Sequence, residues 1–300
     1  MNNPTGQQPG ILLLGKQGQL GWELQRCLQP LGKVLAFDYP EIDLSHPDSI
    51  RPLIREVKPT VLVNATAYTA VDRAESEVEL AMQINAIAPG VMAEECANLD
   101  CVLIHYSTDY VFDGTKGSPY SEEDQPHPLN QYGYSKWMGE QAIQQVDGKY
   151  LIFRTAWVYS LRGESFVRKV LHWSRQQETL RVVEDQVSNP TWARLLAEIT
   201  TLLLARHPLE RTDWLAERKG LYHLAGDGFC SRYEWALAIL ENDPEPESRL
   251  TRQILPAKSA DFPTPAQRPL FSALNCERFY RTFGLRLPGW DQALRLAMSA

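Results

Sequence analysis

Short apolar runs alternate with longer amphipathic segments through the first half of the chain. The apolar runs predict buried parallel strands at residues 10–14, 34–37, 60–64, 102–107 and 151–154. The segments between them place apolar side chains at helical spacing at residues 19–31, 47–57 and 75–98, the last interrupted at Pro89. This alternation predicts an α/β fold with a Rossmann-type doubly wound parallel sheet, in which ligands bind at the carboxyl ends of the strands.

The pattern loosens beyond residue 158. Helical spacing recurs at residues 166–176, 194–206, 275–283 and 291–298. Residues 242–270 are rich in proline and charge, which leaves few backbone donors and predicts loops. We therefore expect the second half to form a smaller lobe that covers the ligand edge of the sheet.

Composition narrows the class of protein. The chain has 300 residues, 44% hydrophobic and 22% charged, and its formal net charge of −7 argues against nucleic acid or an anionic membrane as partner. The five cysteines show no C-x-x-C spacing and the six histidines no H-x-x-x-H spacing, so we expect reduced thiols and no metal site. Residues 1–9 lack the apolar stretch of a signal peptide, and no run approaches the roughly 20 apolar residues of a membrane span. We expect a cytoplasmic protein with a flexible extension at residues 1–9.

A glycine motif follows the first predicted strand. Gly15, Gly18 and Gly21 form a G-x-x-G-x-x-G run that opens the first predicted helix. Such glycines allow a tight turn, close approach of the backbone to a pyrophosphate and close packing of the helix, whose N-terminus then faces the phosphates. We interpret this segment as a dinucleotide-binding site that includes Gln19 and Leu20. The alternative is a glycine-rich turn that binds no ligand.

A carboxylate ends the second predicted strand. Asp38 lies where it can bond the adenosine ribose hydroxyls and would repel a 2′-phosphate, unless it is simply a solvated turn residue. Lys16 can partly offset that repulsion, so the choice between NADH and NADPH stays open. Asp43 and Leu44 follow and can flank the adenine, with an ordinary loop pair as the alternative.

Two further segments follow predicted strands at the ligand edge. Residues 64–69 include Ala67, Tyr68 and Thr69, and small residues there let the backbone approach a cofactor, although a plain strand-to-helix loop is the alternative. Residues 107–114 begin with two hydroxyl side chains, the second being Thr108, which can bond a substrate oxygen that gains charge in a reaction. Either hydroxyl can instead cap a turn.

The pair Tyr132 and Lys136 carries the most chemical information. Four residues apart on a helix, the two side chains share one face. An ammonium group beside a phenol stabilises the phenolate, so we expect Lys136 to lower the pKa of Tyr132 from about 10 toward neutrality. A tyrosine tuned in this way can exchange a proton with an alkoxide, the acid–base step of ketone–alcohol redox chemistry. The spacing alone also occurs by chance in many helices.

Taken together, these segments resemble the extended short-chain dehydrogenase/reductases, and among them the dTDP-4-dehydrorhamnose reductase family. The run S-T-D-Y-V-F-D-G at residues 107–114 is more specific than the glycine motif. The resemblance spans roughly residues 10–296 in order and is carried by residues 15–24, 64–75, 107–114, 132–140, 154–159, 189–191 and 268–290.

The resemblance implies an NAD(P)H-dependent reduction of the C4 ketone of dTDP-4-dehydro-6-deoxy-L-mannose to dTDP-L-rhamnose. It implies that Tyr132 protonates the carbonyl oxygen, that Lys136 bonds the nicotinamide ribose, and that Thr108 polarises the carbonyl. Asp109 would contact the sugar with Thr108, and Trp157 would line the sugar pocket, with core packing as the alternative for Trp157. The family's cofactor contacts map onto Gly18, Gln19, Leu20, Asp43, Leu44, Ala67, Tyr68 and Thr69.

The resemblance also implies a domain organisation. Residues 10–160 would form the NAD(P)-binding domain, which the chain re-enters near residues 181–226, and residues 161–300 would form mainly the substrate-binding lobe. Some family members dimerise through magnesium held by carboxylates, and Glu23 matches the first of these. Arg194 stands where a second acid is expected, and a cation there disfavours the metal. We therefore expect a monomer or a weak homodimer without magnesium.

Three alternatives remain at this point. A nucleotide-sugar 4,6-dehydratase or epimerase is disfavoured because Tyr110 stands where the dehydratase pattern has a catalytic glutamate. A noncatalytic regulatory subunit of methionine adenosyltransferase belongs to the same superfamily, and the intact Thr108, Tyr132 and Lys136 favour an enzyme instead. A reductase of another 4-keto nucleotide-sugar would share all of these residues.

Overall fold

A six-stranded parallel sheet forms the centre of the molecule. The computed structural model describes residues 10–208 and 210–299. The strand order is β10-β5-β4-β3-β1-β2. The strands are β1 (Ile11–Leu14), β2 (Val34–Phe37), β3 (Val61–Asn64), β4 (Val102–Thr108), β5 (Lys149–Thr155) and β10 (Gly220–His223), and every neighbouring pair runs parallel. The predicted Rossmann-type fold is therefore confirmed, and its last strand comes from the second half of the chain.

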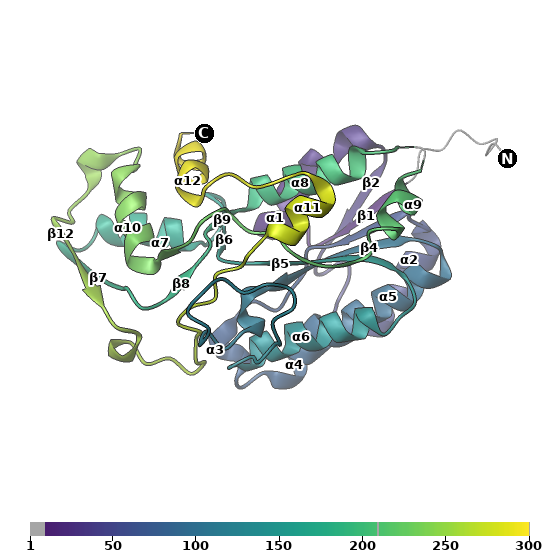
Figure 1. Ribbon diagram of the computed structural model, residues 1–300, viewed down its shortest axis with the longest axis horizontal. Coiled ribbons are helices and arrows are strands. Elements are labelled where there is room, and N and C mark those ends of the chain that lie inside the picture. Colours follow the sequence, from purple (N-terminus) through teal and green to yellow (C-terminus); the bar gives the residue numbers. More distant parts are fainter. Residues whose placement is uncertain (1–9, 209, 300) are drawn as a thin grey trace.

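Helices cover both faces of this sheet (Figure 1). One face packs against α1 (Gln19–Cys27), α8 (Ala193–Ala205), α9 (Arg211–Ala216) and α11 (Glu277–Phe283). The other face packs against α2 (Ile50–Val57), α5 (Ala88–Asn98) and α6 (Gln131–Gln144). Because successive strand residues point to opposite faces, Ile104 lies in the first core and its neighbour Leu103 in the second.

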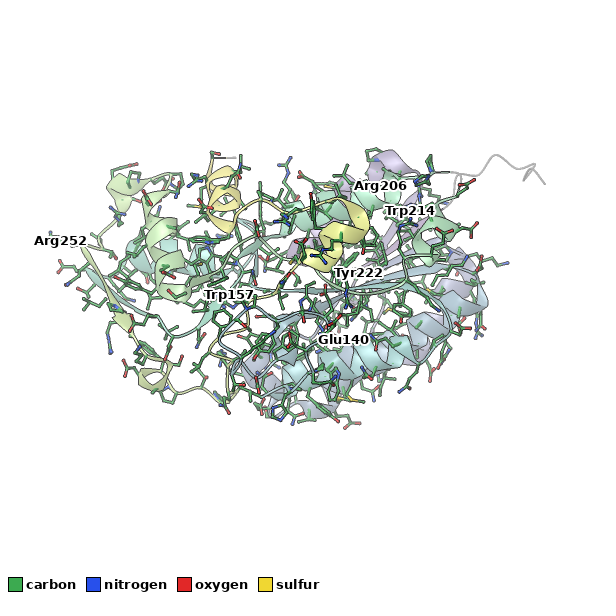
Figure 2. All side chains as sticks on the ribbon, viewed as in Figure 1. Glu140, Trp157, Arg206, Trp214, Tyr222 and Arg252 are labelled. Atoms are coloured by element: carbon green, nitrogen blue, oxygen red, sulfur yellow. The ribbon has the colours of Figure 1, made fainter. Side chains whose placement is uncertain are left out.

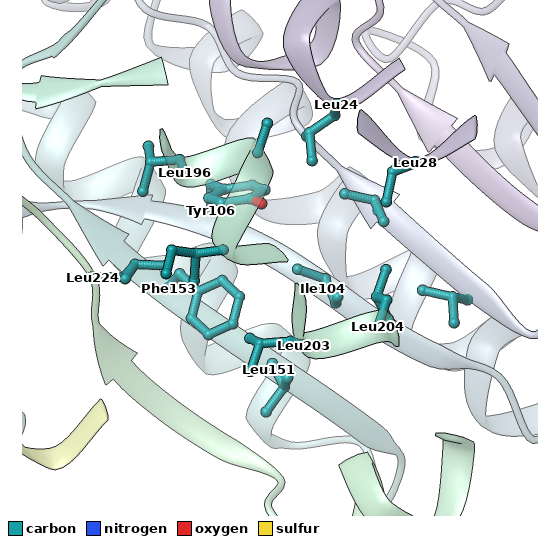
Figure 3. Packing of buried hydrophobic residues seen from close by; sticks show 14 of the residues in the cluster. Leu24, Leu28, Ile104, Tyr106, Leu151, Phe153, Leu196, Leu203, Leu204 and Leu224 are labelled. Carbon is teal, nitrogen blue, oxygen red and sulfur yellow. The ribbon is translucent and has the colours of Figure 1, made fainter. Parts of the chain in front are cut away.

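Figure 3 shows the first of these cores. Leucines from α1 and α8 meet alternate residues of the central strands, among them Ile104 and Tyr106 of β4 and Phe153 of β5. The segment containing α8 comes from far along the chain, yet α8 packs directly beside α1. This packing fixes α1, and with it the glycine turn before α1, against the sheet.

The predicted helix at residues 75–98 begins only at Val78 and changes its hydrogen-bonding pattern along its length. After the short α3 (Val71–Ala74), α4 (Val78–Met82) leads into a π-helical turn at Gln83–Ile87, and α5 begins at Ala88. Pro89 lies just after the π-helical turn, and the helix continues through it along α5, so the expected interruption at Pro89 does not occur.

The second lobe lies beyond the sheet edge, at the left of Figure 1. It contains α7 (Phe166–Ser174), α10 (Arg232–Glu241) and α12 (Trp290–Met298). The strands β7 (Thr179–Val183) and β12 (Gln253–Ala257) form a parallel pair, and the two-residue strands are β6 (Val158–Tyr159), β8 (Val187–Ser188), β9 (Thr191–Trp192) and β11 (Cys230–Ser231).

One prediction for this lobe is wrong. Residues 242–270 were expected to form loops only, but β12 lies within them. Pro256 is paired with Val182 inside this strand. A two-stranded sheet leaves the outer side of each strand open, so a residue without an N–H is tolerated there.

The cysteines and the helix lengths bear on what the composition led us to expect. The five cysteines are free thiols. Across residues 10–208 and 210–299, the helices are too short or too polar to cross a bilayer. The extension expected at residues 1–9 lies outside the described residues.

Candidate active site

A cleft of about 610 Å³ opens at the carboxyl ends of β1, β3, β4 and β5. It joins the glycine motif to the Tyr132–Lys136 pair, as the parallel-sheet topology predicts. The predicted site residues that line it are Gly15, Gly18, Gln19, Leu20, Asp38, Ala67, Thr69, Thr108, Asp109, Tyr132, Lys136 and Trp157.

Four other predicted residues do not line the cleft. Gly21 packs beneath the turn, and Leu44 belongs to the second core. The Asp43 carboxylate accepts hydrogen bonds from Ser45, which lower its pKa. The Tyr68 hydroxyl donates to Glu77 at 2.5 Å, away from the cleft. A cofactor contact of these four remains a prediction.

The glycine turn forms a cradle that side chains would obstruct. Gly15 has a φ of +92°, in the left-handed region that glycine tolerates best. A Cβ at Gly21 would overlap the carbonyl of Gly15, so the helix can approach the turn only at a glycine. Gly18 caps α1 without a side-chain acceptor, which leaves the first amides of the helix to bind an anion. These features fit a dinucleotide pyrophosphate.

The residues expected to contact the adenosine ribose lie at the rim of this cradle. The Asp38 carboxylate accepts a hydrogen bond of 2.8 Å from the backbone N–H of Gln17, which fixes it beside the turn. Lys16 forms an ion pair of 2.5 Å with Glu41. The cation that could offset the repulsion of a 2′-phosphate is thus itself partnered by a carboxylate.

The start of α6 is fixed from three directions. The Asn130 side chain caps the helix by accepting from the N–H of Gly133 at 2.8 Å, and it donates to the carbonyl of Gln267 at 2.7 Å. A Cβ at Gly133 would overlap the carbonyl of Tyr110, so α6 packs directly on the turn after β4. The Tyr132 ring lies edge-on to the ring of Tyr110, which belongs to that turn, with the two ring centres 5.8 Å apart.

The structure corrects the expected tuning of Tyr132. Burial raises the pKa of this phenol above its ordinary value of 10, and the neighbouring Thr108 hydroxyl offsets only part of the rise. Lys136 Nζ points instead at β4, where it donates to the carbonyl of Tyr106 at 2.7 Å and faces His105 Nε2 at 3.3 Å. Burial lowers the pKa of Lys136 to about 8. Tyr132 therefore stays protonated at neutral pH, which is the form a general acid requires.

Thr108 ends β4 and Asp109 follows it, and both line the cleft beside Tyr132. The buried Asp109 carboxylate accepts hydrogen bonds from the hydroxyls of Ser272 at 2.5 Å, Ser188 at 3.0 Å and Thr108 at 3.2 Å. Burial raises the pKa of Asp109 to about 6, and the three hydroxyls limit this rise. Both serines belong to the second lobe and carried no sequence signal for this role.

A buried ion pair supports the same strands. Glu140 of α6, labelled in Figure 2, accepts two hydrogen bonds from Arg154 of β5, at 2.9 and 2.6 Å, and one from Ser107 of β4 at 2.5 Å. A bidentate pair of this kind fixes the relative position of its two elements. It therefore holds α6, and the tyrosine at its start, against β4 and β5.

Trp157 lies between the two lobes (Figure 2). Its φ of +40° is unusual for a bulky residue and turns the indole toward the second lobe, where it stacks on Trp235 with ring centres 5.5 Å apart. The guanidinium of Arg232 lies over the Trp157 ring at 3.6 Å from its centre and over the ring of Phe166 at 4.7 Å. The position of Trp157 suits both the expected sugar contact and core packing.

Arg232 could not be singled out from the sequence, because α10 itself was not predicted and a lone arginine carries no motif. Arg232 is half-buried and lines both the catalytic cleft and a neighbouring hollow of about 900 Å³. Burial lowers its pKa to about 10. Among the residues described, no carboxylate lies within ion-pair distance of its guanidinium. An unpaired cation at this junction is suited to bind an anionic group.

The residues expected near a magnesium ion do not fit one. Arg194 of α8 pairs with Glu198 at 2.9 Å and lies close enough to Glu23 to lower the pKa of that carboxyl, although burial raises it overall. A cation among these carboxylates competes with a metal. Within residues 10–208 and 210–299, no cluster of three or more His, Cys, Asp or Glu side chains has the arrangement of a metal site.

Comparisons with known proteins agree with this geometry. Residues 9–300 match the family described as RmlD substrate binding domain. A dTDP-4-dehydrorhamnose reductase from Burkholderia thailandensis is 41% identical over 291 residues, which cover 96% of this chain and 97% of that protein. The protein of the same name from Escherichia coli K12 is 42% identical over 290 residues, which cover 95% of each.

Solved structures give the same result. The crystal structure of a dTDP-4-dehydrorhamnose reductase from Bacillus anthracis in complex with NADP superposes with a TM-score of 0.87 and 30% identity, covering 97% of this chain and 99% of that one. A Thermus thermophilus UDP-glucose 4-epimerase, with a TM-score of 0.77 but 19% identity, shares the fold.

Proposed function

Because this chain belongs to the dTDP-4-dehydrorhamnose reductase family, we propose that it reduces the C4 ketone of dTDP-4-dehydro-6-deoxy-L-mannose to dTDP-L-rhamnose. The protein is an NAD(P)H-dependent oxidoreductase of dTDP-L-rhamnose biosynthesis, and a relative crystallised with NADP supports NADPH as its reductant. The observation that carries the proposal is the convergence of Tyr132, Thr108 and Asp109 on the cleft that the glycine cradle enters.

The chain offers two groups of contacts for the cofactor. Gly15, Gly18 and the first turn of α1 would hold the pyrophosphate, and Asp38 would face the adenosine ribose. Lys136 lines the same cleft and is assigned to the nicotinamide ribose. When bound, the reduced nicotinamide supplies the hydride that reduces the ketone.

Tyr132 is assigned the role of general acid. Its raised pKa keeps the proton on the phenol at neutral pH, so the proton is available when negative charge develops on the C4 oxygen. Thr108 lines the cleft beside Tyr132, and its hydroxyl is assigned to polarise the same carbonyl. Protonation of the alkoxide by Tyr132 completes the alcohol.

The remaining cleft residues are assigned to the dTDP-sugar. Asp109 would accept hydrogen bonds from sugar hydroxyls, and Trp157 would pack on the sugar ring. Arg232 is assigned to the diphosphate, because it is the cation at the junction of the two hollows and its guanidinium lacks a carboxylate partner among the described residues.

Three further properties remain predictions. They are the cytoplasmic location, the absence of nucleic-acid and membrane partners, and the state of monomer or weak homodimer.

An enzymatic assay tests the proposal. The ketone substrate is generated in situ from dTDP-glucose with the upstream dehydratase and 3,5-epimerase, and loss of reduced-nicotinamide absorbance is followed with NADPH and with NADH separately. Turnover with dTDP-L-rhamnose as product supports the proposal, and the ratio of the two rates gives the cofactor preference. A folded protein that binds nicotinamide but oxidises neither cofactor would point to another keto-sugar or to a regulatory subunit.

A further inference from the structure

One buried hydroxyl on the catalytic cleft makes no hydrogen bond to the rest of the protein described here. Thr155, the last residue of β5, lines the cleft and is 7% exposed. Its Oγ1 is buried and has no hydrogen-bond partner among residues 10–208 and 210–299. Because a buried hydroxyl without a hydrogen bond costs free energy, a group of this kind on a ligand cleft points to a bond with the ligand. Gln19 Oε1 shares this property, and Gln19 already belongs to the predicted cofactor contacts.

The register of the sheet places Thr155 beside Thr108. The two residues are direct partners in the parallel pair of β4 and β5. Two positions earlier, Tyr106 of β4 and Phe153 of β5 point into the first core, with ring centres 5.9 Å apart. Because side chains alternate along a strand, Thr108 and Thr155 lie on that same side of the sheet. The two threonine side chains are therefore neighbours at the end of the cleft that Tyr132 lines.

These neighbours identify the ligand group that can reach Thr155. Thr108 is assigned to the ketone, and the carbon that gives up the hydride must come within about 3–3.5 Å of the ketone carbon. The nicotinamide ring therefore belongs at this end of the cleft. The helix α1, which begins at the glycine cradle, packs on the same side of the sheet as Thr155. A cofactor held by the cradle thus reaches the ketone along the side on which Thr155 lies.

The polar substituent of the nicotinamide ring is a carboxamide, which offers an acceptor oxygen and an NH₂ donor. A threonine hydroxyl can both donate and accept, so it can pair with either end of that group. We propose that Thr155 is a cofactor-binding residue whose hydroxyl hydrogen-bonds the nicotinamide carboxamide. Such a bond restricts rotation of the ring about its bond to the ribose. The proposal rests on the proposed function for the position of the ketone.

The affinities of two ligands, measured by calorimetry without the sugar substrate, test the proposal. NADP⁺ carries the nicotinamide, and 2′-phospho-ADP-ribose is the same molecule without it. Thr155→Val keeps the shape of the side chain and removes the hydroxyl. It should weaken NADP⁺ binding by about 5-fold, the loss of one net hydrogen bond, and leave 2′-phospho-ADP-ribose binding unchanged. Thr155→Ser keeps the hydroxyl and should retain most of the NADP⁺ affinity. If the reductase prefers NADH, NAD⁺ and ADP-ribose replace this pair.

Thr200→Val is the matched control. Thr200 is a fully buried threonine of α8 whose hydroxyl accepts from the Tyr106 hydroxyl at 2.6 Å and donates to the carbonyl of Leu196 at 2.8 Å. Loss of this bonded hydroxyl should lower the Tm of the free protein by about 2–4 °C. Loss of the unpartnered Thr155 hydroxyl should leave the Tm unchanged or raise it. A Tm that falls as far in Thr155→Val as in Thr200→Val would contradict the premise.

Two binding results would overturn the proposal. One is an unchanged NADP⁺ affinity in Thr155→Val. The other is an equal loss of affinity for both ligands, which would give Thr155 a structural role only. Because these measurements omit the sugar nucleotide, the proposal can fail while reduction is observed. A selective loss of NADP⁺ affinity in a protein that reduces no sugar would support the nicotinamide contact and contradict only the proposed function.

Discussion

The hydroxyl of Ser272 donates a 2.5 Å hydrogen bond to the buried carboxylate of Asp109, although 163 positions separate them in the sequence. Ser188 donates to the same carboxylate from a third segment. The end of β4 is thus bonded directly to the second lobe. The contact between this end of β4 and the second lobe and the charge of Asp109 therefore depend on the same few hydroxyl groups.

The charge of Asp109 predicts an acid limb in the activity profile. Since the pKa of Asp109 is raised to about 6, kcat/KM for the sugar should fall as the pH drops below about 6 and the carboxylate is protonated. Ser272→Ala removes a donor that favours the charged form and should move this limb to higher pH, whereas Ser248→Ala, an exposed serine on a distant turn, should not. An unmoved limb in Ser272→Ala would argue against Asp109 as its source.

The same group also affects stability. The folded protein binds a proton at Asp109 more readily than the unfolded chain, whose aspartate pKa is about 3.9. The contribution of this residue to the free energy of unfolding should therefore grow as the pH falls from about 6 to about 4. Urea unfolding gives the free energy of unfolding of wild type and Asp109→Asn across this range. As the pH falls from about 6 to about 4, the value for the wild type should rise relative to the value for Asp109→Asn.

Removal of the Tyr132 hydroxyl should abolish the acid step and spare binding. We expect Tyr132→Phe to lower kcat by about 10²–10⁴, the usual contribution of one general acid. The dissociation constant of NADPH, measured by fluorescence, should change little because the phenol lies apart from the glycine cradle. The matched control is Tyr134→Phe, an exposed tyrosine on the same helix. A Tyr132→Phe enzyme with wild-type kcat would exclude this tyrosine as the acid.

Loss of the Arg232 cation should weaken binding of the dTDP group. Arg232→Met should raise the dissociation constant of dTDP by about 10-fold or more, the loss of one charge-assisted hydrogen bond. Binding of NADPH should be affected less. Arg218→Met is the control, because Arg218 also lies over a tryptophan, Trp214, but far from either hollow. Equal dTDP affinity in wild type and Arg232→Met would assign Arg232 to packing alone.

Breaking the buried ion pair between Glu140 and Arg154 should cost more stability than breaking an exposed ion pair. Glu140→Gln leaves a buried guanidinium without its counter-charge and should lower the free energy of unfolding by on the order of 3 kcal/mol. Glu198→Gln, which breaks the exposed pair with Arg194, should cost less than about 1 kcal/mol. Chemical denaturation of the two variants beside the wild type makes the comparison.

Much of the large sheet could be predicted from the sequence, because its strands are continuous apolar runs set between helical patterns. The predicted strand at 34–37 coincides with β2, and Tyr132 and Lys136 do lie on one helix at the ligand edge. The glycine motif was also sufficient to place the cradle, since its geometry depends on a local turn.

The rest depends on contacts between distant segments. The shift in the pKa of Tyr132 was predicted in the wrong direction. The spacing from Tyr132 to Lys136 reveals neither that the phenol is buried nor that Lys136 donates its hydrogen bond to the carbonyl of Tyr106. Arg232 and Ser272 reach the site only through the packing of the second lobe. The strand β12 was missed because Pro256 normally argues against a strand.

The last strand of the large sheet has a consequence for synthesis of the chain. β5 ends at Thr155, but its outer neighbour β10 begins only at Gly220. During translation, one edge of the growing sheet therefore stays without its hydrogen-bonding partner for the time needed to add some 65 residues, several seconds at typical ribosome speeds. An open strand edge is a template for pairing with other chains. In a nascent chain within this interval, the longer strand β5 is thus an open edge, whereas in the complete chain the four-residue strand β10 covers it.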